Sequence, residues 1–354
     1  MDISPYLKLV VEKEASDIYF TVGSQVRIKV SGKVIIVGKT ILTAEMTQAI
    51  AHNIMNDMQR IVFSKKLEID FAITQPEIKA RFRVNAFKQK EMISIVMRYI
   101  KSKVPCFDDL NLPPILKNLI MHKRGLLLMV GATNSGKSTT LAAMIDYRNE
   151  NQAGHILTIE DPIEFVHPHK KSLINQRELE VDTHSYLQAL RSAMRESPDV
   201  ILIGEIRDKE TMGSALELSN TGHLAISTLH ANNAYQAMQR VINMFSIDQH
   251  KQLFMDLSLN LVGIISQRLV VGVNNKRVAA VEVMINTPYT ADLILKGKID
   301  EIKEAMAGST VEGIQSFDAA LFNLYKDGII TLEEALANAD SRTNLQTKIA
   351  FGKG

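Results

Sequence analysis

The chain has 354 residues, of which 46% are hydrophobic and 23% are charged, and its formal net charge is +2. These are ordinary values for a soluble globular protein that is long enough for two domains. The small net charge gives no strongly positive electrostatic potential of the kind typical of nucleic-acid-binding proteins. Its single cysteine, Cys106, excludes an internal disulfide and a zinc site built on cysteine clusters. The first residues carry no signal-peptide pattern, and no apolar run approaches the roughly 20 residues that span a bilayer. We therefore expect no nucleic-acid partner and no direct membrane insertion.

The first hundred residues combine helix and strand patterns in the manner of a small α+β domain. One helix is predicted from Pro5 to Lys13, and a second, with apolar residues at helical spacing, from Ala44 to Phe63. Predicted strands cover residues 17–22, 26–30, 34–37, 69–74, 81–87 and 92–99. We expect one domain over residues 1–100. Prolines at 105, 113 and 114 then favour a linker over residues 101–122.

From residue 123 the pattern changes to strands alternating with helices, which is typical of a parallel sheet. Predicted strands cover residues 126–130, 155–159, 200–203 and 224–229. Predicted helices cover residues 185–196, 232–245 and 248–267, and a hairpin turning at 274–275 pairs residues 268–273 with 276–285. From about residue 288 the pattern favours short helices ended by Gly297, Gly308, Gly313 and Gly328. We expect a second, α/β domain over residues 123–354, including this C-terminal helical region.

Residues 131–138 read Gly-Ala-Thr-Asn-Ser-Gly-Lys-Ser and complete the phosphate-loop motif G-x-x-x-x-G-K-[ST]. A buried-strand pattern precedes the motif and a helix pattern follows it, which is the context that the motif requires. Lys137 would reach the β- and γ-phosphates of ATP, Ser138 would bind Mg²⁺, and backbone N–H groups would surround the phosphates. The nucleotide-binding residues expected here are Gly131, Thr133, Asn134, Ser135, Gly136, Lys137, Ser138 and Thr139.

Carboxylates at the ends of two predicted strands fit the chemistry of phosphoryl transfer. Glu205 lies at the carboxyl end of its strand, where ligands bind in open α/β sheets, and it could orient or deprotonate the attacking water. Glu160, Asp161 and Glu164 follow the strand 155–159 and would repel one another without a cation nearby. A Mg²⁺–phosphate site explains that density, with Glu160 and Asp161 as metal contacts and Glu164 as a catalytic group. A solvated acidic turn, and for Glu205 an ordinary loop start, are the alternatives.

Two histidines, His223 and His230, bracket the predicted strand 224–229. Because their separation is odd, they would face opposite sides of a continuous strand, which argues against a two-histidine metal site. At the C-terminal end, His230 could contact the γ-phosphate or Glu205. A purely structural role stays open for both histidines, although we include both among the candidate catalytic residues.

Arginines could supply positive charge for the transferred phosphate. Arg81 and Arg83 alternate with apolar residues, so both point from the same strand face, and Arg98 lies on a neighbouring predicted strand. Two arginines on one face of a separate domain could bind the phosphates of a nucleotide that lies across an interface from them. On residue type alone, a solvated edge strand is an equally good interpretation.

Taken in order, these blocks resemble those of the secretion-type ATPases, and most closely the type IV pilus retraction ATPases of the PilT/PilU family. The resemblance covers nearly the whole chain and rests on the phosphate loop and on residues 81–87, 158–164 (the family's Asp box), 197–208 (its atypical Walker B motif) and 221–230 (its His box). It implies a PAS-like α+β N-terminal domain joined to a RecA-like P-loop ATPase domain with C-terminal helices. It also implies a homo-hexamer in which nucleotide lies between the two domains.

The same resemblance implies site residues and partners. Arginines matching Arg81, Arg83 and Arg98 would approach the nucleotide, in part from a neighbouring subunit. ATP hydrolysis would drive pilus retraction and twitching motility from a cytoplasmic, peripheral position at the inner-membrane base of the pilus. The partner there would be the inner-membrane pilus platform protein.

Two departures from the family pattern are informative. Asn134 stands where the family usually has glycine, and asparagine tolerates left-handed backbone better than other non-glycine residues, so the loop should keep its shape. Residues 290–297 lack the arginines of the Ala-Ile-Arg-Asn-Leu-Ile-Arg-Glu box found in PilT, and with residues 315–322 they resemble the accessory, PilU-type branch. We expect an accessory retraction ATPase that works with a PilT-like ATPase. A non-hydrolysing adaptor ring and a RecA-like nucleic-acid translocase are the alternatives.

Overall fold

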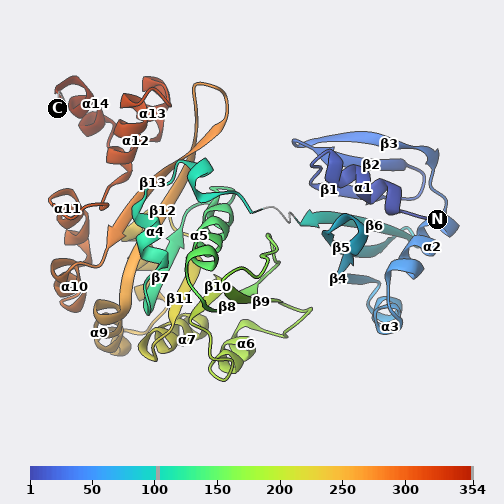
Figure 1. The fold of residues 1–354 in the computed structure, drawn as a ribbon, viewed down its shortest axis with the longest axis horizontal. Coiled ribbons are helices and arrows are strands. Elements are labelled where there is room, and N and C mark those ends of the chain that lie inside the picture. The colour runs from blue at the N-terminus through green and yellow to red at the C-terminus, as the bar shows by residue number, and fades with distance from the viewer. Residues whose placement is uncertain (101–103, 352–354) are drawn as a thin grey trace. The chain divides into compact units, whose positions relative to one another are not determined.

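A computed structural model describes residues 1–100 and 104–351, which form two compact units (Figure 1). The first unit contains residues 1–100 and 164–166, and the second contains residues 104–163 and 167–351. Residues 101–103, at the start of the predicted linker, lie outside the described residues. Within the described ranges, no helix combines the length and the apolarity that a bilayer span requires.

The first unit is built on an antiparallel sheet of six strands in the order β3-β2-β1-β6-β5-β4. Its strands are β1 (Asp17–Phe20), β2 (Gln25–Val30), β3 (Lys33–Ile41), β4 (Glu68–Gln75), β5 (Ala80–Gln89) and β6 (Met92–Ile100). Its helices are α1 (Ser4–Glu12), α2 (Ala44–Ile54), α3 (Asp57–Lys66) and the short η1 (Pro76–Ile78). Alternate strand residues, such as Phe82 and Val84 on β5, are fully buried in one core. This is the α+β arrangement that the sequence predicts.

The single helix predicted over residues 44–63 is wrong, because the chain breaks between α2 and α3. Asn56 is extended and caps α3: its side chain accepts a hydrogen bond from the Gln59 amide, and the Gln59 side chain accepts one from the Asn56 amide. This reciprocal cap satisfies two donors at the start of a new helix. Met58 and Ile61, two of the apolar residues at helical spacing in the predicted helix, are exposed.

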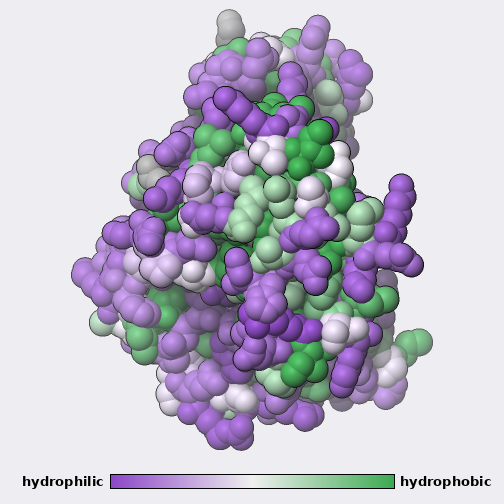
Figure 2. All heavy atoms as spheres, turned by 90° about the vertical axis from the view of Figure 1, so that its right-hand side faces the viewer, coloured by the Kyte–Doolittle hydropathy of each residue, from purple (hydrophilic) through white to green (hydrophobic). Residues whose placement is uncertain are grey.

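An edge of this sheet carries exposed apolar side chains. β3 is the edge strand, and Val34, Ile35 and Ile36 on it are exposed. Figure 2 shows one face of the molecule as largely hydrophilic, with hydrophobic side chains gathered in patches. Exposed apolar residues on an edge strand make it a potential contact surface.

The second unit is built on a seven-stranded sheet in the order β13-β12-β7-β11-β10-β8-β9. All pairings are parallel except that of β12 with β13. The strands are β7 (Gly125–Val130), β8 (Gly154–Glu160), β9 (Ser172–Glu178), β10 (Val200–Glu205), β11 (Leu224–Leu229), β12 (Leu261–Val271) and β13 (Arg277–Ile285). The predicted parallel α/β sheet is confirmed, and the edge strand β9, which contains Asn175 and Gln176, is an addition that the sequence pattern did not indicate.

Helices cover both faces of this sheet (Figure 1). On one face pack η2 (Phe107–Leu110), α4 (Ile115–Ile120) and α5 (Lys137–Asn151). On the other pack α6 (Tyr186–Ala193), α7 (Lys209–Asn220), α8 (Ala234–Asn243), α9 (His250–Asn260), α10 (Pro288–Leu295), η4 (Ile299–Glu301) and α11 (Ile302–Ala307), and the short η3 (Ile247–Gln249) precedes α9 with no buried residue. Leu116 and Ile120 of α4 are fully buried, so part of the stretch predicted as a linker belongs to the core of the second unit.

The helix predicted over residues 248–267 is also wrong in its second half. α9 ends at Asn260, and the chain continues directly as β12, which pairs with β7 on one side and β13 on the other. Its β-branched residues Val262, Ile264 and Ile265 are buried, as suits a central strand. The hairpin is therefore longer than predicted, and it brings Gln267 next to the strand that leads into the phosphate loop.

The C-terminal helices α12 (Phe317–Lys326), α13 (Leu332–Asn338) and α14 (Arg342–Phe351) form a small core against the β12–β13 hairpin. Phe317 and Leu321 are fully buried in it. Three of the predicted helix-ending glycines do lie at helix ends: Gly297, Gly308 and Gly328. Gly313 was predicted wrongly, because it lies in a turn between α11 and α12 and ends no helix.

Candidate functional site

The phosphate loop lies between β7 and α5, in the predicted strand–loop–helix arrangement. Gly131 has φ 153° and Gly136 has φ 85°, conformations that side chains rarely adopt. A Cβ atom on Gly131 would lie 2.5 Å from the carbonyl oxygen of Gln267, so the loop requires glycine there for space as well. Asn134 has φ 63°, so this asparagine takes the left-handed conformation that the sequence analysis anticipated.

Several donors in this loop suit phosphate oxygens. Lys137 Nζ donates to the carbonyl oxygens of Gly131 and Ala132, each at 2.8 Å, which holds the ammonium group inside the loop. Ser135 Oγ is buried and has no hydrogen-bond partner within the described part of the chain. The first amides of α5 have no acceptor within the helix. An ammonium group, an orphaned hydroxyl and helix N-terminal amides together fit the phosphates of a nucleotide.

The residues present also fit a magnesium ion bound with the nucleotide. Residues 1–100 and 104–351 contain no group of three or more His, Cys, Asp or Glu side chains that could hold a metal by themselves. Magnesium at phosphate sites usually takes only one or two protein ligands and completes its shell with water and phosphate oxygens. Ser138, in the first turn of α5, offers one such oxygen. Glu160 Oε1 already accepts hydrogen bonds from Thr158 Oγ1 at 2.6 Å and Gln176 Nε2 at 3.2 Å, so its metal role stays a prediction.

Glu205 stands at the end of β10 with a donor on each carboxylate oxygen. His230 Nε2 lies 3.0 Å from Oε1, and Arg207 Nε donates to Oε2 at 2.9 Å. Its side chain is 18% exposed, whereas that of Arg207 is 71% exposed. The carboxylate is therefore oriented by contacts from both sides at the edge of the sheet where the phosphate loop also lies. Contact with this carboxylate is one of the two roles that the sequence suggested for His230.

The charges of three carboxylates, on Glu160, Asp161 and Glu205, act on the phenol of Tyr186, a residue that was not among the predicted site residues. A Cβ atom on Gly204 would lie 2.6 Å from the Tyr186 hydroxyl, so the phenol packs directly on the main chain before Glu205. Burial raises the pKa of this phenol most, and the charges of the three carboxylates raise it further. The phenol therefore stays protonated and can donate a hydrogen bond. No motif marks it, because it lies at the start of an ordinary amphipathic helix.

The structure does not bring His223 into this group. Its Nδ1 lies 3.1 Å from the carbonyl oxygen of Leu218, at the opposite end of β11 from His230, and seven strand residues span roughly 20 Å. Glu164 is exposed and groups with the first unit, so its catalytic role also stays a prediction.

The three candidate arginines share one face of the sheet in the first unit. Arg81 and Arg83 alternate with buried residues on β5, as predicted, and Arg83 is directly opposite Arg98 on β6. Like charges in such a pair repel each other. Nearby carboxylates offset the repulsion: Arg98 Nε donates to Asp17 at 2.9 Å, and Arg83 Nε lies 3.9 Å from Asp70. We call Arg81, Arg83 and Arg98 the arginine face.

A buried glutamine on β12 was likewise missed. Gln267 Nε2 donates to the carbonyl oxygen of Ser135 at 2.8 Å, and Thr140 Oγ1 donates to Gln267 Oε1 at 2.7 Å. Its side chain thus braces both the phosphate loop and α5. No local pattern indicates this contact, because residue 267 lies at the end of a predicted helix.

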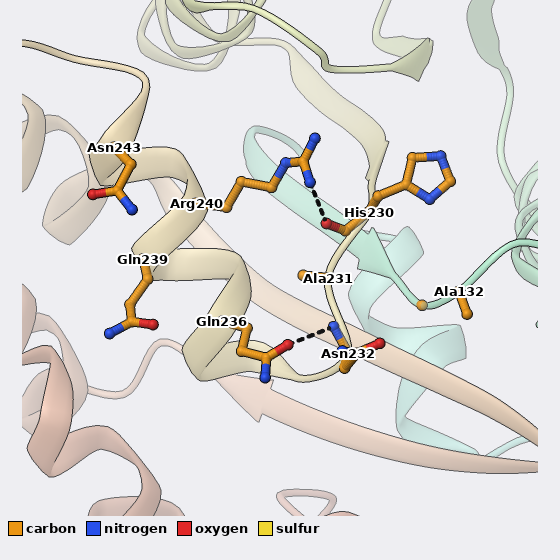
Figure 3. Close-up of a pocket in the computed structure, with 9 residues that line it drawn as sticks. Ala132, His230, Ala231, Asn232, Gln236, Gln239, Arg240 and Asn243 are labelled. Carbon is orange, nitrogen blue, oxygen red and sulfur yellow. Dashed lines mark hydrogen bonds between the residues drawn. The ribbon is translucent and has the colours of Figure 1, made fainter.

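Two cavities adjoin the phosphate loop. The larger, of about 470 Å³, is lined by the loop, by His230 and by polar residues of α8 (Figure 3). Arg240 Nη1 donates to the carbonyl oxygen of His230 at 3.0 Å, while the imidazole points away from α8. The smaller, of about 260 Å³, lies among the loop, Gln267, Arg268 and Asn338. The loop therefore has open space on two sides.

Comparison with known proteins gives consistent likenesses. The profile of the family described as Type II/IV secretion system protein matches residues 1–305. The Type IV pilus ATPase PilU of Pseudomonas aeruginosa is 48% identical over 99% of this chain and 92% of its own length. PilT of the same organism, a type IV pilus retraction ATPase, is 42% identical over 96% of this chain and 98% of its own.

A solved structure is similar as well. The pilus retraction motor PilT with bound ADP superposes with a TM-score of 0.90 at 37% identity, covering 98% of this chain and 99% of that one. Such agreement over both units extends the likeness from local motifs to the whole fold, and an ATPase with a phosphate loop is what both the geometry and the relatives indicate. The chain therefore belongs to the Type II/IV secretion system protein family, within its branch of type IV pilus ATPases.

Proposed function

We propose that this chain is a ring-forming motor that couples ATP hydrolysis to retraction of type IV pili, as an accessory to a second, PilT-like ATPase. The observation that carries the proposal is the 48% identity with PilU over 99% of the chain. It is supported by a phosphate loop whose donors suit a nucleotide and by an oriented carboxylate at the same sheet edge. ATP is the proposed substrate, with Mg²⁺ as its ion.

The phosphate loop binds the nucleotide in this proposal. Lys137 exchanges its carbonyl partners for β- and γ-phosphate oxygens, and the orphaned hydroxyl of Ser135 gains an acceptor. Ser138 holds Mg²⁺, which neutralises charge on the phosphates when bound. The remaining loop residues, Thr133, Asn134 and Thr139, contribute through the backbone amides that surround the phosphates.

Glu205 acts on the attacking water. Its two oxygens are each held by one donor, so the carboxylate keeps its orientation while a lone pair stays available to accept a proton from water. The water oxygen attacks the γ-phosphorus, the bond to the ADP oxygen breaks, and Glu205 takes the water proton. Tyr186, which stays protonated, is placed to donate a hydrogen bond within the carboxylate group.

Assembly completes the site in this proposal. The arginine face belongs to a different unit from the phosphate loop, and arginine suits the charge that develops on a transferred phosphoryl group. A homo-hexamer would let some of these arginines act on a neighbouring subunit's nucleotide. We place the ring in the cytoplasm at the inner-membrane base of the pilus, against the platform protein.

The accessory role depends on α10. Its region, residues 290–297, contains no arginine, and Lys296 is paired with Asp292 at 2.7 Å on the helix surface. Arginine offers several donors in a fixed plane, which a lysine already paired on its own helix cannot reproduce. We therefore expect the nucleotide site to turn over ATP while this surface transmits less force than the matching surface of PilT.

Pilus retraction in cells tests the proposal. With this protein as the only retraction ATPase, we expect ATP hydrolysis by the purified protein but no retraction, and restoring the PilT-like ATPase should give retraction that this protein strengthens under load. Cells carrying the Glu205→Gln variant are the matched control, because their ring should assemble without turnover. Robust retraction without the PilT-like ATPase would contradict the accessory role, and nucleotide binding without any turnover would contradict the motor itself.

A further inference from the structure

Two consecutive residues of β12, Gln267 and Arg268, contact different regions of the second unit. Adjacent residues on a strand point to opposite faces of the sheet. Gln267 contacts the phosphate loop and α5, whereas Arg268 contacts the C-terminal helices. Because the two side chains share one backbone segment, a shift of β12 moves both sets of contacts.

The contacts of Gln267 hold the phosphate loop closely. Its side chain is 2% exposed, and both polar atoms of its amide are used: Nε2 donates to the Ser135 carbonyl, and Oε1 accepts from Thr140. A Cβ atom on Gly136 would lie 2.7 Å from Nε2, so the loop packs directly on this amide. A small displacement of Gln267 therefore changes the position of backbone amides that bind phosphate.

The contacts of Arg268 hold the C-terminal helices. Its Nη1 donates to the carbonyl oxygen of Asn338 at 3.0 Å, and its Nη2 lies 2.7 Å from Asp340 Oδ1. The guanidinium also stacks 3.9 Å from the centre of the Phe317 ring. Two segments of the C-terminal helical region, the start of α12 and residues 338–340 after α13, thus meet on one side chain that is only 26% exposed. Arginine is suited to this because its planar group combines directional donors with stacking.

We propose that Gln267 and Arg268 couple the docking of α12–α14 to the phosphate loop, with Gln267 as a positioning residue of the nucleotide site. Docked C-terminal helices fix β12 through Arg268, and β12 fixes the loop through Gln267. Coupling of this kind is reciprocal, so bound nucleotide also strengthens the docking of the C-terminal helices. The proposal rests on nucleotide binding at the phosphate loop and does not depend on a role in pilus retraction.

A double-mutant cycle on the full-length protein tests the coupling, with affinity for a fluorescent ATP analogue as the readout. Arg268 lines a cavity beside the loop, so the docking side is perturbed through Asp340 instead. Asp340→Ala should weaken binding at least about fivefold. Gln267→Leu should weaken binding of the analogue as well. Adding Asp340→Ala to Gln267→Leu should cause little further loss of affinity, because β12 no longer holds the phosphate loop through Gln267.

Matched controls distinguish the proposed coupling from a non-specific loss of stability in the C-terminal helices. Asp327→Ala removes an exposed carboxylate at the end of α12 and should leave the affinity unchanged. Amide hydrogen exchange in α12–α14 should slow when the ATP analogue binds the natural protein, and this protection should be absent in Gln267→Leu. Additive losses in the double variant, an equal loss in Asp327→Ala, or unchanged protection in Gln267→Leu would each overturn the proposal. The exchange measurement decides alone if Asp340→Ala does not fold.

Discussion

The phosphate loop and the arginine face are built in contrasting ways. The loop is held by a side chain that is 2% exposed, Gln267, whose amide bonds to Ser135 and Thr140. On the arginine face, the side chain of Arg98 is 67% exposed and that of its partner Asp17 is 6% exposed, whereas Arg83 and Asp70 are both partly exposed. Buried hydrogen bonds in a low-dielectric interior fix positions firmly, whereas exposed ion pairs contribute little and rearrange readily.

This difference indicates which part of the proposed catalytic site a single chain holds in position by itself. Residues of the second unit itself hold the loop, so nucleotide affinity should belong to the second unit alone. The arginine face belongs to the other unit, so its contribution to turnover should depend on assembly. Each prediction below tests one side of this contrast.

The largest effect is expected for Glu205→Gln. The amide keeps the shape of the side chain but cannot accept the water proton, so turnover should fall by roughly 10²–10⁴-fold. Nucleotide affinity should stay within about threefold, since the loop donors are untouched. Steady-state ATPase assays and nucleotide titration measure the two quantities. Normal turnover in the purified variant would show that Glu205 is not the base.

Lys137→Ala tests whether affinity lies in the loop. Loss of a charged donor to phosphate should weaken ATP binding by about 10–100-fold and abolish hydrolysis. Thermal stability should change little, because the Lys137 side chain is not part of the hydrophobic core of the second unit. Calorimetric titration and thermal unfolding check both statements. Full affinity in Lys137→Ala would move the nucleotide site elsewhere.

Arg83→Ala tests the dependence of the arginine face on assembly. Turnover should fall roughly 100-fold, while the nucleotide affinity of the full-length variant should stay unchanged, because the phosphate loop belongs to the second unit. Mixing Arg83→Ala subunits with Glu205→Gln subunits should restore part of the activity, because a ring then contains intact pairs across subunit boundaries. Mixed rings that are verified by mass and still inactive would favour action within one chain.

His167 makes the second unit more sensitive to acid than the first. Burial lowers the pKa of its imidazole to about 4, against an ordinary value of 6.5. The folded state therefore binds the proton less than the unfolded state, so stability is full above pH 6.5 and falls by about 2 kcal/mol by pH 5.

Hydrogen exchange resolved by unit, followed from pH 7 to pH 5, checks this prediction. His167→Gln should flatten the pH dependence of the second unit, and His52→Gln, which changes the exposed and only histidine in residues 1–100, should alter nothing. A first unit that unfolds before the second on acidification would contradict the assignment.

The smallest effect is expected for Asp70→Asn. Its oxygen lies 3.9 Å from Arg83 Nε, and both side chains are partly exposed, so the ion pair should contribute less than about 0.5 kcal/mol to the stability of the first unit. Urea unfolding measures this change. A loss above about 1 kcal/mol would show that local ion pairs do hold the arginine face in place.

The parts of the site that depend on consecutive residues could be predicted from the amino-acid sequence. The phosphate loop needs its glycines, lysine and serine at fixed spacing, and even the left-handed conformation of Asn134 followed from local sterics. Glu205 could be placed at the carboxyl end of a strand because a short apolar run between polar residues is a local pattern. The shared face of Arg81 and Arg83 followed from the two-residue period of a strand.

Contacts between residues of distant segments could be read only from the folded structure. Residues 261–267 continue a helical pattern in sequence, and they form a strand because β7 and β13 satisfy their backbone on both sides and bury their side chains. That pairing places Gln267 against the phosphate loop, and the return of α6 to the sheet edge places Tyr186 among the carboxylates. Such contacts join residues more than a hundred positions apart in the case of Gln267, and no local spacing encodes them, because their free energy arises only when the sheet has formed.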